Sequence, residues 1–424
     1  MRVTHLSLTD FRNYAAAEVP LLAGANLIVG RNGQGKTNLV EALGYLSTLG
    51  SHRVSDDKAM IRAGQPAAII RARLEYNGRD ILTEVQLNRT GLNRAQVNRS
   101  AIRTRDLPRY FSSVVFAPED LALVRGDPSG RRRFLDQLLV LRSPRLSGVI
   151  ADYERVLKQR NTLLKSARGS GMKDGQLSTL DIWDERLVAL GSEIIDERAE
   201  LVRLLGEPLR AAYRAVVDED HRPELLPLLS IFGGDELSLV ASRGVSTSIS
   251  TGVSTGSTSE GGAAQGLSRG VSTGVSTGST GTTQATSGAG TPTTADAFRA
   301  ALAGLRRKEM ERGITLVGPH RDDLVFMLND LPAKGYASHG ESWSFALSLK
   351  LASAELLRRE SASGDPVLIL DDVFAELDQS RRTRLAEAII GYEQVLITAA
   401  VLDDVPEALT AHVIHIRGGA VVDG

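Results

Sequence analysis

The chain has 424 residues, 42% of them hydrophobic, which is enough for a substantial core in two domains or in one large domain with an insertion. It contains no cysteine, which excludes disulfides, thiolate metal sites and cysteine nucleophiles. Its 50 basic and 51 acidic residues nearly cancel, so any nucleic-acid surface must come from local clustering. Since no apolar run has the length of a bilayer crossing and no secretion signal is present, we expect a cytoplasmic protein without a membrane partner.

The phosphate-loop pattern G-x-x-x-x-G-K-[ST] occurs at residues 30–37. The apolar stretch 26–29 predicts a buried strand before it, and the leucine spacing of 37–46 predicts a helix after it. Because both flanking elements are present, we interpret the segment as a triphosphate site rather than as a glycine-rich turn with a chance lysine. We expect Lys36 to reach the β- and γ-phosphates and assist catalysis, and the Thr37 hydroxyl to ligate Mg²⁺. The predicted nucleotide-binding residues are Gly30, Arg31, Asn32, Gly33, Gln34, Gly35, Lys36 and Thr37.

Strands and then helices follow the loop. Alternating residues at 68–75 and 80–87, separated by Asn77–Gly78, predict a hairpin, and 113–116 predicts a further strand. A helix is expected from Gly130, capped by Ser129. Amphipathic segments at 145–165 and 180–216, the second interrupted at 206–208, predict an antiparallel helical arm.

The composition changes abruptly at residues 241–294, where Gly-Val-Ser-Thr recurs among other small polar residues. Such a segment cannot bury a core, so we expect a disordered insertion. Helical signals resume at 295–312. The predicted layout is an N-terminal head segment (1–125), a helical arm or second lobe (126–240), the insertion (241–294), and the rest of the second lobe and head (295–424).

A second nucleotide element lies at 366–372, where an apolar strand ends in Asp371 and Asp372. Alone, this pattern is explained equally well by a helix start. Paired with the phosphate loop it resembles a Walker B strand, in which Asp371 would hold Mg²⁺ and Asp372 would polarise the attacking water as the catalytic carboxylate. Asp378, six residues further on, resembles the D-loop of ABC-type ATPases.

Residues 336–343, ahead of a predicted helix at 345–357, resemble the ABC signature loop. In that family the loop acts in trans, on the γ-phosphate held by the partner of a head-to-head dimer. The residues in this role would be Ser338, Gly340 and Glu341; the family commonly has Gln where Glu341 stands. An ordinary serine-capped helix is the alternative. Thr398 is our candidate for the position of the transporter switch histidine, and Glu119 or Asp120 for the Q-loop.

In combination, residues 8–14, 318–324 and 370–378 resemble the RecF family of bacterial DNA-repair ATPases, which is related to SMC and Rad50 heads. The resemblance implies an α/β ABC-type P-loop ATPase head with an inserted helical arm, and ATP and Mg²⁺ as cofactors. It implies an ATP-driven homodimer clamp with weak ATPase activity, binding single-stranded DNA and gapped or duplex junctions. Its implied roles are recombinational repair, replication restart, recombinase loading and the SOS response, with RecO- and RecR-type partners.

Other readings of the motifs stay open. An SMC- or Rad50-type repair ATPase of another branch, a transporter-type ABC subunit, a P-loop kinase and a non-enzymatic scaffold share the phosphate loop. The short arm argues against SMC and Rad50 proteins, which have coiled coils of hundreds of residues. The missing switch histidine argues against a transporter subunit.

Arginines gather in two stretches, between residues 94 and 109 and between 125 and 145. Arginine-rich surfaces bind phosphate without reading base sequence. Solvated helix faces and salt bridges are the common alternative, and the lack of interleaved aromatic residues argues against a base-stacking platform. The predicted DNA contacts are Arg99, Arg103, Arg105, Arg131 and Arg132. For His320 and Arg321 we expect a structural or dimer-communication role rather than a metal site.

Overall fold

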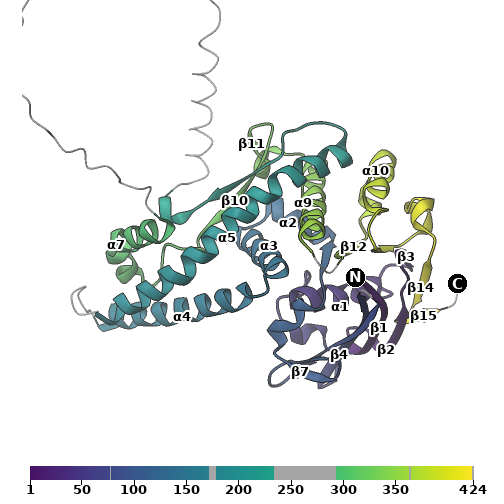
Figure 1. Ribbon diagram of the computed structural model, residues 1–424, viewed down its shortest axis with the longest axis horizontal. Coiled ribbons are helices and arrows are strands. Elements are labelled where there is room, and N and C mark those ends of the chain that lie inside the picture. The colour runs from purple at the N-terminus through teal and green to yellow at the C-terminus, as the bar shows by residue number, and fades with distance from the viewer. Residues whose placement is uncertain (77, 171–177, 234–292, 362–363, 423–424) are drawn as a thin grey trace, which may run out of the picture.

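The computed structural model of the chain describes residues 1–76, 78–170, 178–233, 293–361 and 364–422 (Figure 1). A head built on two sheets carries both described chain ends, and a helical arm extends from it (Figure 1). No helix in these ranges is both long and apolar enough to cross a bilayer.

The central sheet of the head assembles strands that are far apart in the sequence. Its order is β15 (Ala420–Val422), β14 (Val413–Arg417), β3 (Gly24–Val29), β13 (Gln394–Ala399), β12 (Val367–Asp371) and β8 (Ser113–Phe116). All neighbouring pairs are parallel except β14 with β15. Every residue of β12 and β13 is buried, as expected for central parallel strands covered on both faces. The predicted strands at 26–29 and 113–116 are confirmed, with β3 starting two residues earlier.

Side chains alternate between the two faces of this sheet. On β12, Val367 and Ile369 pack in the core that contains helix α1 (Lys36–Thr48) and the second sheet. Leu368 and Leu370 pack in the core that contains helix α9 (His339–Glu360). The strand therefore holds the two halves of the head together, and its last residue, Asp371, lies between them.

The second sheet of the head is antiparallel and packs on the α1 side. Its order is β2 (Tyr14–Pro20), β1 (Arg2–Phe11), β4 (Ala67–Tyr76), β5 (Arg79–Asn88), β6 (Arg94–Val97) and β7 (Ser100–Ile102). The predicted hairpin is confirmed by the pairing of Tyr76 with Arg79. Asn77, which was expected in its turn, lies outside the described residues. The short helices η1 (Asp57–Met60) and η2 (Thr104–Arg109) border this sheet, whereas η3 (Pro118–Asp120) leads into α2 (Leu121–Arg125), which packs against α9.

The arm consists of α4 (Leu146–Ser170), α5 (Ser178–Val217) and α7 (Thr294–Arg312), joined to the head by α3 (Pro128–Arg142). An apolar core includes Tyr153, Leu187 and Phe298, one from each arm helix. The fully buried Arg160 of α4 binds Asp184 of α5 at 2.6 Å and Glu309 of α7 at 2.7 Å. This buried ion network fixes the three helices against one another.

The predicted interruption of α5 at residues 206–208 is wrong, because the helix is continuous through Pro208. Leu205, Leu209 and Tyr213 are fully buried on either side of that residue. Their packing, including the edge contact of Tyr213 with Phe345 of α9, outweighs the local cost of the proline.

Two predicted helix boundaries also shift. Helix α3 begins at Pro128, with Asp127 as its N-cap, rather than at Gly130, because proline suits the first helical position. Residues 241–292 of the expected insertion lie outside the described residues. Thr293 and Thr294 were counted in it, but they begin α7, where the Thr293 hydroxyl accepts from the backbone N–H of Asp296.

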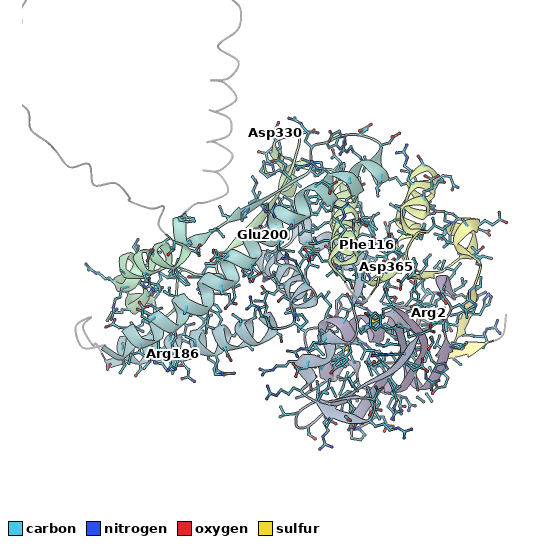
Figure 2. The ribbon with its side chains drawn as sticks, in the orientation of Figure 1. Arg2, Phe116, Arg186, Glu200, Asp330 and Asp365 are labelled. Carbon is cyan, nitrogen blue, oxygen red and sulfur yellow. The ribbon has the colours of Figure 1, made fainter. Side chains whose placement is uncertain are left out.

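The remaining elements connect the arm to the nucleotide side of the head. A small sheet, β9 (Glu224–Leu228), β10 (Asp323–Leu328) and β11 (Leu331–Pro332), precedes α8 (Ala333–Tyr336) and α9. Helix η5 (Ser230–Phe232) follows β9, while η6 (Phe374–Glu376), α10 (Gln379–Ile389), η7 (Leu402–Asp404) and η8 (Glu407–Leu409) complete the C-terminal part. Phe116 lies at the end of β8, where the head joins its helical half (Figure 2). Its ring packs edge to face against Trp343 of α9, with 4.8 Å between the ring centroids.

Candidate functional site

The phosphate loop connects β3 to α1, as the sequence predicts. Gly35 has a φ of +113°, which L side chains rarely adopt, and a Cβ there would crowd Asn13 and Tyr14. A Cβ on Gly30 would lie 2.5 Å from the carbonyl oxygen of Ile416. Both positions therefore require glycine, because the loop backbone there leaves no room for a side chain.

The structure brings Lys36, Thr37 and Asp371 together. The Thr37 hydroxyl donates to Asp371 Oδ1 at 3.1 Å, and the buried Lys36 has its Nζ 3.4 Å from Asn32 Oδ1. The contact arises because β13 pairs with both β3 and β12, so the strand ends that carry the two motifs meet at one edge of the sheet. A hydroxyl and a carboxylate are the hard oxygen ligands that Mg²⁺ takes beside phosphate and water. No group of three or more His, Cys, Asp or Glu side chains in the described ranges forms a metal cage of its own.

Asp372 follows the strand in a left-handed conformation, with φ of +52°. Burial raises the pKa of its carboxyl, Lys36 opposes the rise, and Asp371 adds to it. Thr398 lies between the two aspartates: its hydroxyl donates to Asp371 Oδ1 at 2.6 Å and accepts from the backbone N–H of Asp372 at 2.9 Å. Thr398 therefore orients the expected metal ligand and the expected catalytic residue at once.

The hairpin between β1 and β2 supports the phosphate loop, a role that the sequence patterns did not reveal. The Tyr14 hydroxyl donates to the carbonyl of Gly35 at 3.1 Å, and the Asn13 amide donates to the carbonyl of Gln34 at 3.2 Å. Arg12 binds the buried Glu41 of α1 through two hydrogen bonds, at 2.6 and 2.8 Å. Residues 11–14 thus hold both the loop and the helix that follows it.

An open basic depression of about 590 Å³ adjoins the loop. Four cationic side chains and two asparagines line it, together with Ala59, Ile61 and Ala63; the polar members are Arg12, Asn13, Asn38, Arg53, Lys58 and Arg89. Asn38 belongs to the first turn of α1 and donates to Asn13 at 2.7 Å. The depression therefore begins where the phosphate cradle ends.

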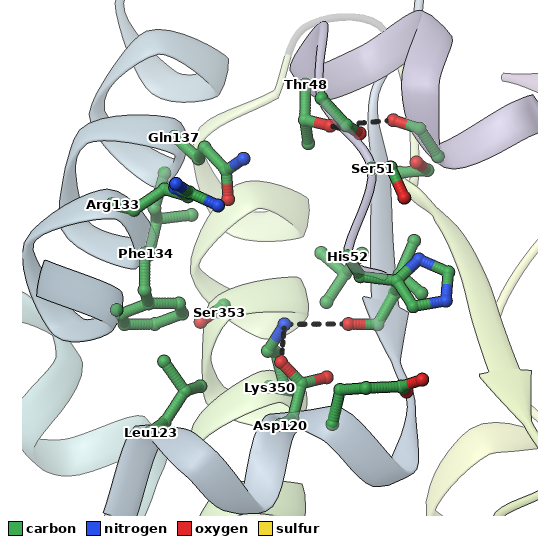
Figure 3. Close-up of a pocket in the computed structure, with 18 of the residues that line it drawn as sticks. Thr48, Ser51, His52, Asp120, Leu123, Arg133, Phe134, Gln137, Lys350 and Ser353 are labelled. Atoms are coloured by element: carbon green, nitrogen blue, oxygen red, sulfur yellow. Dashed lines mark hydrogen bonds and ion pairs between the residues drawn. The ribbon is translucent and has the colours of Figure 1, made fainter. Parts of the chain in front are cut away.

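His52 is a second feature that the sequence did not mark. Its Nε2 atom is buried, forms no hydrogen bond within the described structure, and lies 3.8 Å from Asp371 Oδ2. His52 also lines a cavity of about 280 Å³ between α1, β8, α3 and α9 (Figure 3). The cavity thus lies between the two halves of the head, and its wall residue His52 adjoins Asp371, the expected metal ligand.

The Q-loop candidates border this cavity with different roles. Asp120 binds Lys350 of α9 at 2.9 Å, and Lys350 also donates to the carbonyl of Val115 at 2.8 Å (Figure 3). Glu119 is exposed and lies 4.0 Å from Arg53. Asp120 therefore links β8 to α9 through Lys350, whereas the carboxylate of Glu119 is exposed and has, among the residues that the structure describes, only the distant contact with Arg53.

The signature residues form the first turn of α9. Ser338 is the N-cap and accepts from the Glu341 N–H at 3.2 Å, while Glu341 accepts from the Ser338 N–H at 2.8 Å. Hydrogen bonds from Ser338 lower the pKa of the Glu341 carboxyl. A Cβ on Gly340 would lie 3.3 Å from the Arg381 guanidinium, and Asp378 caps α10, accepting from the Arg381 N–H at 2.9 Å. The serine-capped helix is therefore confirmed, with Ser338 exposed at its start, while the role of this turn in trans stays a prediction.

The predicted DNA contact at Arg131 is wrong. The side chain is buried and binds Asp323 through two hydrogen bonds, at 2.7 and 2.8 Å, and donates to two main-chain carbonyls. Arg132 is half-buried, donates to the carbonyl of Asp322 at 2.8 Å, and has its pKa lowered by burial and by Arg198. Arg131 therefore joins α3 to β10 and cannot face a ligand.

The other predicted DNA contacts are exposed. Arg99 lies in the turn between β6 and β7, with φ of +67°, and Arg103 and Arg105 flank the start of η2. Arg103 and Arg105 line a cleft of about 330 Å³ with Arg109 and Arg145, the latter just ahead of α4. We call these four residues the arginine cleft. It unites members of the two sequence clusters that lie in different parts of the fold.

The segment 318–323 makes structural contacts within the chain, and the dimer-communication alternative for His320 and Arg321 stays a prediction. His320 Nδ1 lies 2.7 Å from the Tyr153 hydroxyl, and Arg321 donates to the carbonyl of Thr315. Ser230 donates to Asp322 at 2.7 Å. The segment thereby fastens α4 and η5 to the strand that leads back to the head.

Comparison with known proteins gives consistent matches over the full chain. Residues 2–416 match the family described as RecF/RecN/SMC N terminal domain. The DNA replication and repair protein RecF of Leifsonia xyli subsp. xyli (strain CTCB07) is 62% identical, covering 100% of both chains, and that of Clavibacter sepedonicus is 62% identical, covering 100% of this chain and 95% of the relative. A solved structure of the recombination mediator protein RecF with ATP, in the RecFOR pathway, has a TM-score of 0.79 at 24% identity, covering 99% of this chain and 96% of that one. These matches confirm the predicted α/β ABC-type ATPase head with its helical arm.

Proposed function

The chain belongs to the RecF/RecN/SMC N-terminal domain family and, within it, to the RecF proteins, and from this premise we propose that it is an ATP-dependent DNA-binding protein of recombinational repair. The observation that carries the proposal is the contact between Thr37 and Asp371, which joins two motifs 334 residues apart in one site. A fold-level likeness alone would leave the function open, since function resides in the site.

ATP would bind with its phosphates in the loop of residues 30–37. Lys36 would neutralise the β- and γ-phosphates, and Thr37 and Asp371 would hold Mg²⁺, which when bound supplies charge neutralisation at the γ-phosphate. The nucleoside would occupy the open basic depression beside Asn38. The hydrogen bonds from Asn13 and Tyr14 would keep the loop in its binding shape without nucleotide, which lowers the ordering cost of binding.

Hydrolysis would be slow and would need a second copy of the chain. Asp372 would orient the attacking water, but its side chain is one methylene shorter than the glutamate usual at this position. Ser338 and the Gly340 N–H, at the positive end of α9, would complete the γ-phosphate site of the partner. ATP binding would therefore favour the head-to-head dimer, and hydrolysis would release it.

DNA would lie over the arginine cleft and the neighbouring Arg99. Binding would be electrostatic, would weaken steeply with salt, and would not depend on base sequence. At single-strand gaps the ATP-bound dimer would act as a clamp that supports recombinase loading, replication restart and the SOS response, with RecO- and RecR-type mediators as partners.

Sedimentation and ATPase assays on the full chain test this proposal. We expect a monomer without nucleotide, a dimer with ATP and Mg²⁺, and hydrolysis stimulated by gapped DNA. Lys36→Ala should abolish both responses, whereas Arg307→Ala, an exposed change on the arm, is the matched control and should preserve them. A monomer at all ATP concentrations would refute the clamp. Transfer of the γ-phosphoryl group from ATP to a small acceptor, without DNA, would indicate a P-loop kinase instead.

A further inference from the structure

A second hollow adjoins the arginine cleft. It has a volume of about 350 Å³ and shares Arg109 and Pro144 with the cleft. Its walls come from the antiparallel sheet, from η2 and from the ends of α3 and α9, and include Tyr76, Ile81, Pro108, Tyr110 and Leu357. We call this hollow the tyrosine pocket. Both hollows lie along the seam between the head sheet and the base of the arm.

The charge of the two hollows is unequal. In the tyrosine pocket, Arg142 is paired with Glu360 at 2.5 Å, so that end is close to neutral. In the cleft, Arg145 is paired with Glu193 and Glu197, and Arg109 lies 3.5 Å from Asp106. Arg103 and Arg105 form no ion pair in the described part of the chain. The uncompensated positive charge therefore lies at the cleft end, beside a pocket of mixed polar and apolar lining that contains Tyr76, Tyr110 and Phe111.

This pairing fits one class of ligand. A single nucleotide carries an anionic phosphate next to a flat aromatic base, and the two hollows offer a cationic and an aromatic surface that share two residues. Tyrosine and proline side chains accept the face of a base, and stacking on aromatic residues is independent of base identity. Inside a duplex the base faces are already stacked on their neighbours, so only an unpaired base can enter the pocket.

We propose that the arginine cleft and the tyrosine pocket together bind an unpaired nucleotide, with its phosphate on Arg103, Arg105 and Arg109 and its base against Tyr110. The inference rests on the proposed DNA-binding function and deepens it by naming how single-stranded DNA is distinguished from duplex. A base held in the pocket would place the unpaired strand of a gap at the seam, while the adjoining duplex would interact through phosphates alone.

The sequence alone argues against a base-stacking platform, because the arginine stretches lack interleaved aromatic residues. Tyr110 follows Arg109 directly, but Tyr76 is brought to the same pocket from β4, 34 residues away along the chain. Among described residues, the Tyr110 hydroxyl has no hydrogen-bond partner, and its ring is only half-buried. Tyr110 also packs against the apolar core on the α1 side of the head, and this packing holds its side chain at the wall of the pocket.

The test compares Tyr110→Leu with Arg105→Ala by fluorescence anisotropy on single-stranded, gapped and blunt duplex DNA. Losing one stacked base corresponds to an affinity loss of about 5- to 100-fold. We expect that loss for Tyr110→Leu on single-stranded and gapped DNA, with duplex binding unchanged. Arg105→Ala should weaken binding to all three and reduce the salt dependence by about one phosphate contact. Tyr110→Phe, which keeps the ring, should bind like the wild type.

A second readout does not depend on affinity. A 2-aminopurine base in the single strand should be quenched by the wild type and by Tyr110→Phe, and should stay bright with Tyr110→Leu. The inference is overturned if Tyr110→Leu binds single-stranded DNA normally, quenches the probe, or loses duplex binding to the same degree. If the wild type binds no DNA at all, the proposed function fails. If the wild type binds DNA, but Tyr110→Leu and Tyr110→Phe have the same affinity for single-stranded DNA and the same quenching, the proposed function stands and the pocket assignment fails.

Discussion

Removal of the Arg131 guanidinium distinguishes a buried ion pair from a DNA contact. Arg131→Ala deletes two hydrogen bonds to Asp323, at 2.7 and 2.8 Å, and two to carbonyl oxygens, each at 3.1 Å. The two side chains are 5% and 15% exposed, so the truncation leaves a mostly buried carboxylate without its cation. Breaking such a pair costs about 3–5 kcal/mol. Because Asp323 keeps a hydrogen bond from the Leu324 N–H, we expect a loss near the lower limit, about 3 kcal/mol.

Urea unfolding followed by tryptophan fluorescence measures this loss, since Trp183 lies in α5 and Trp343 in α9. Arg133→Ala is the matched control: the residue is two positions away on α3, is exposed, and forms no ion pair in the described ranges, so its unfolding midpoint should not move. Replacing both partners, as Arg131→Met with Asp323→Leu, should recover most of the stability. If Arg131→Ala unfolded like the wild type but bound DNA more weakly, the reasoning from burial would be wrong.

Three further predictions concern the nucleotide site and the arm. Thr398→Val removes the hydroxyl that orients Asp371, so the Mg²⁺ concentration needed for hydrolysis should rise about 10- to 100-fold, and an unshifted Mg²⁺ titration would contradict this. Asp372→Asn should slow turnover at least about 100-fold while calorimetry finds ATP binding intact; normal turnover would remove Asp372 from catalysis. Burial lowers the pKa of His320 from 6.5 to about 4, so below pH 6.5 the unfolded chain takes up a proton that the folded chain does not. The free energy of unfolding should therefore fall by about 3 kcal/mol between pH 6.5 and pH 4, and His320→Gln should remove that slope; an identical slope in the variant would refute the assignment.

The nucleotide site was predictable because its constraints are local. The glycine positions at 30 and 35 encode a backbone path that other residues cannot follow, and the strand and helix signals place that path at a sheet edge. The contact between Thr37 and Asp371 then follows from parallel strands ending at one edge. Thr398 could be placed only approximately, because its two hydrogen bonds depend on the pairing register of β13 with β12.

Long-range contacts account for what the sequence could not give. Arg131 and Arg133 look alike in the sequence, yet the partner that buries one of them, Asp323, lies 192 residues away. The break expected in α5 is absent because packing around Leu209 holds Pro208 in the helix. His52 and Tyr76 carry no motif, and their positions beside Asp371 and the arginine cleft arise only from the folded topology.

The continuity of α5 has a mechanical consequence. A helix of 40 residues is about 60 Å long and acts as a stiff rod, running from the outer end of the arm to its packing against α9 (Figure 1). Since the first turn of α9 carries Ser338 and α9 packs on α5, a sideways push on the distant end of α5 would tilt that turn. In the dimer clamp that we propose, the arm would therefore act as a lever, because a load on its outer end would reach the exposed first turn of α9.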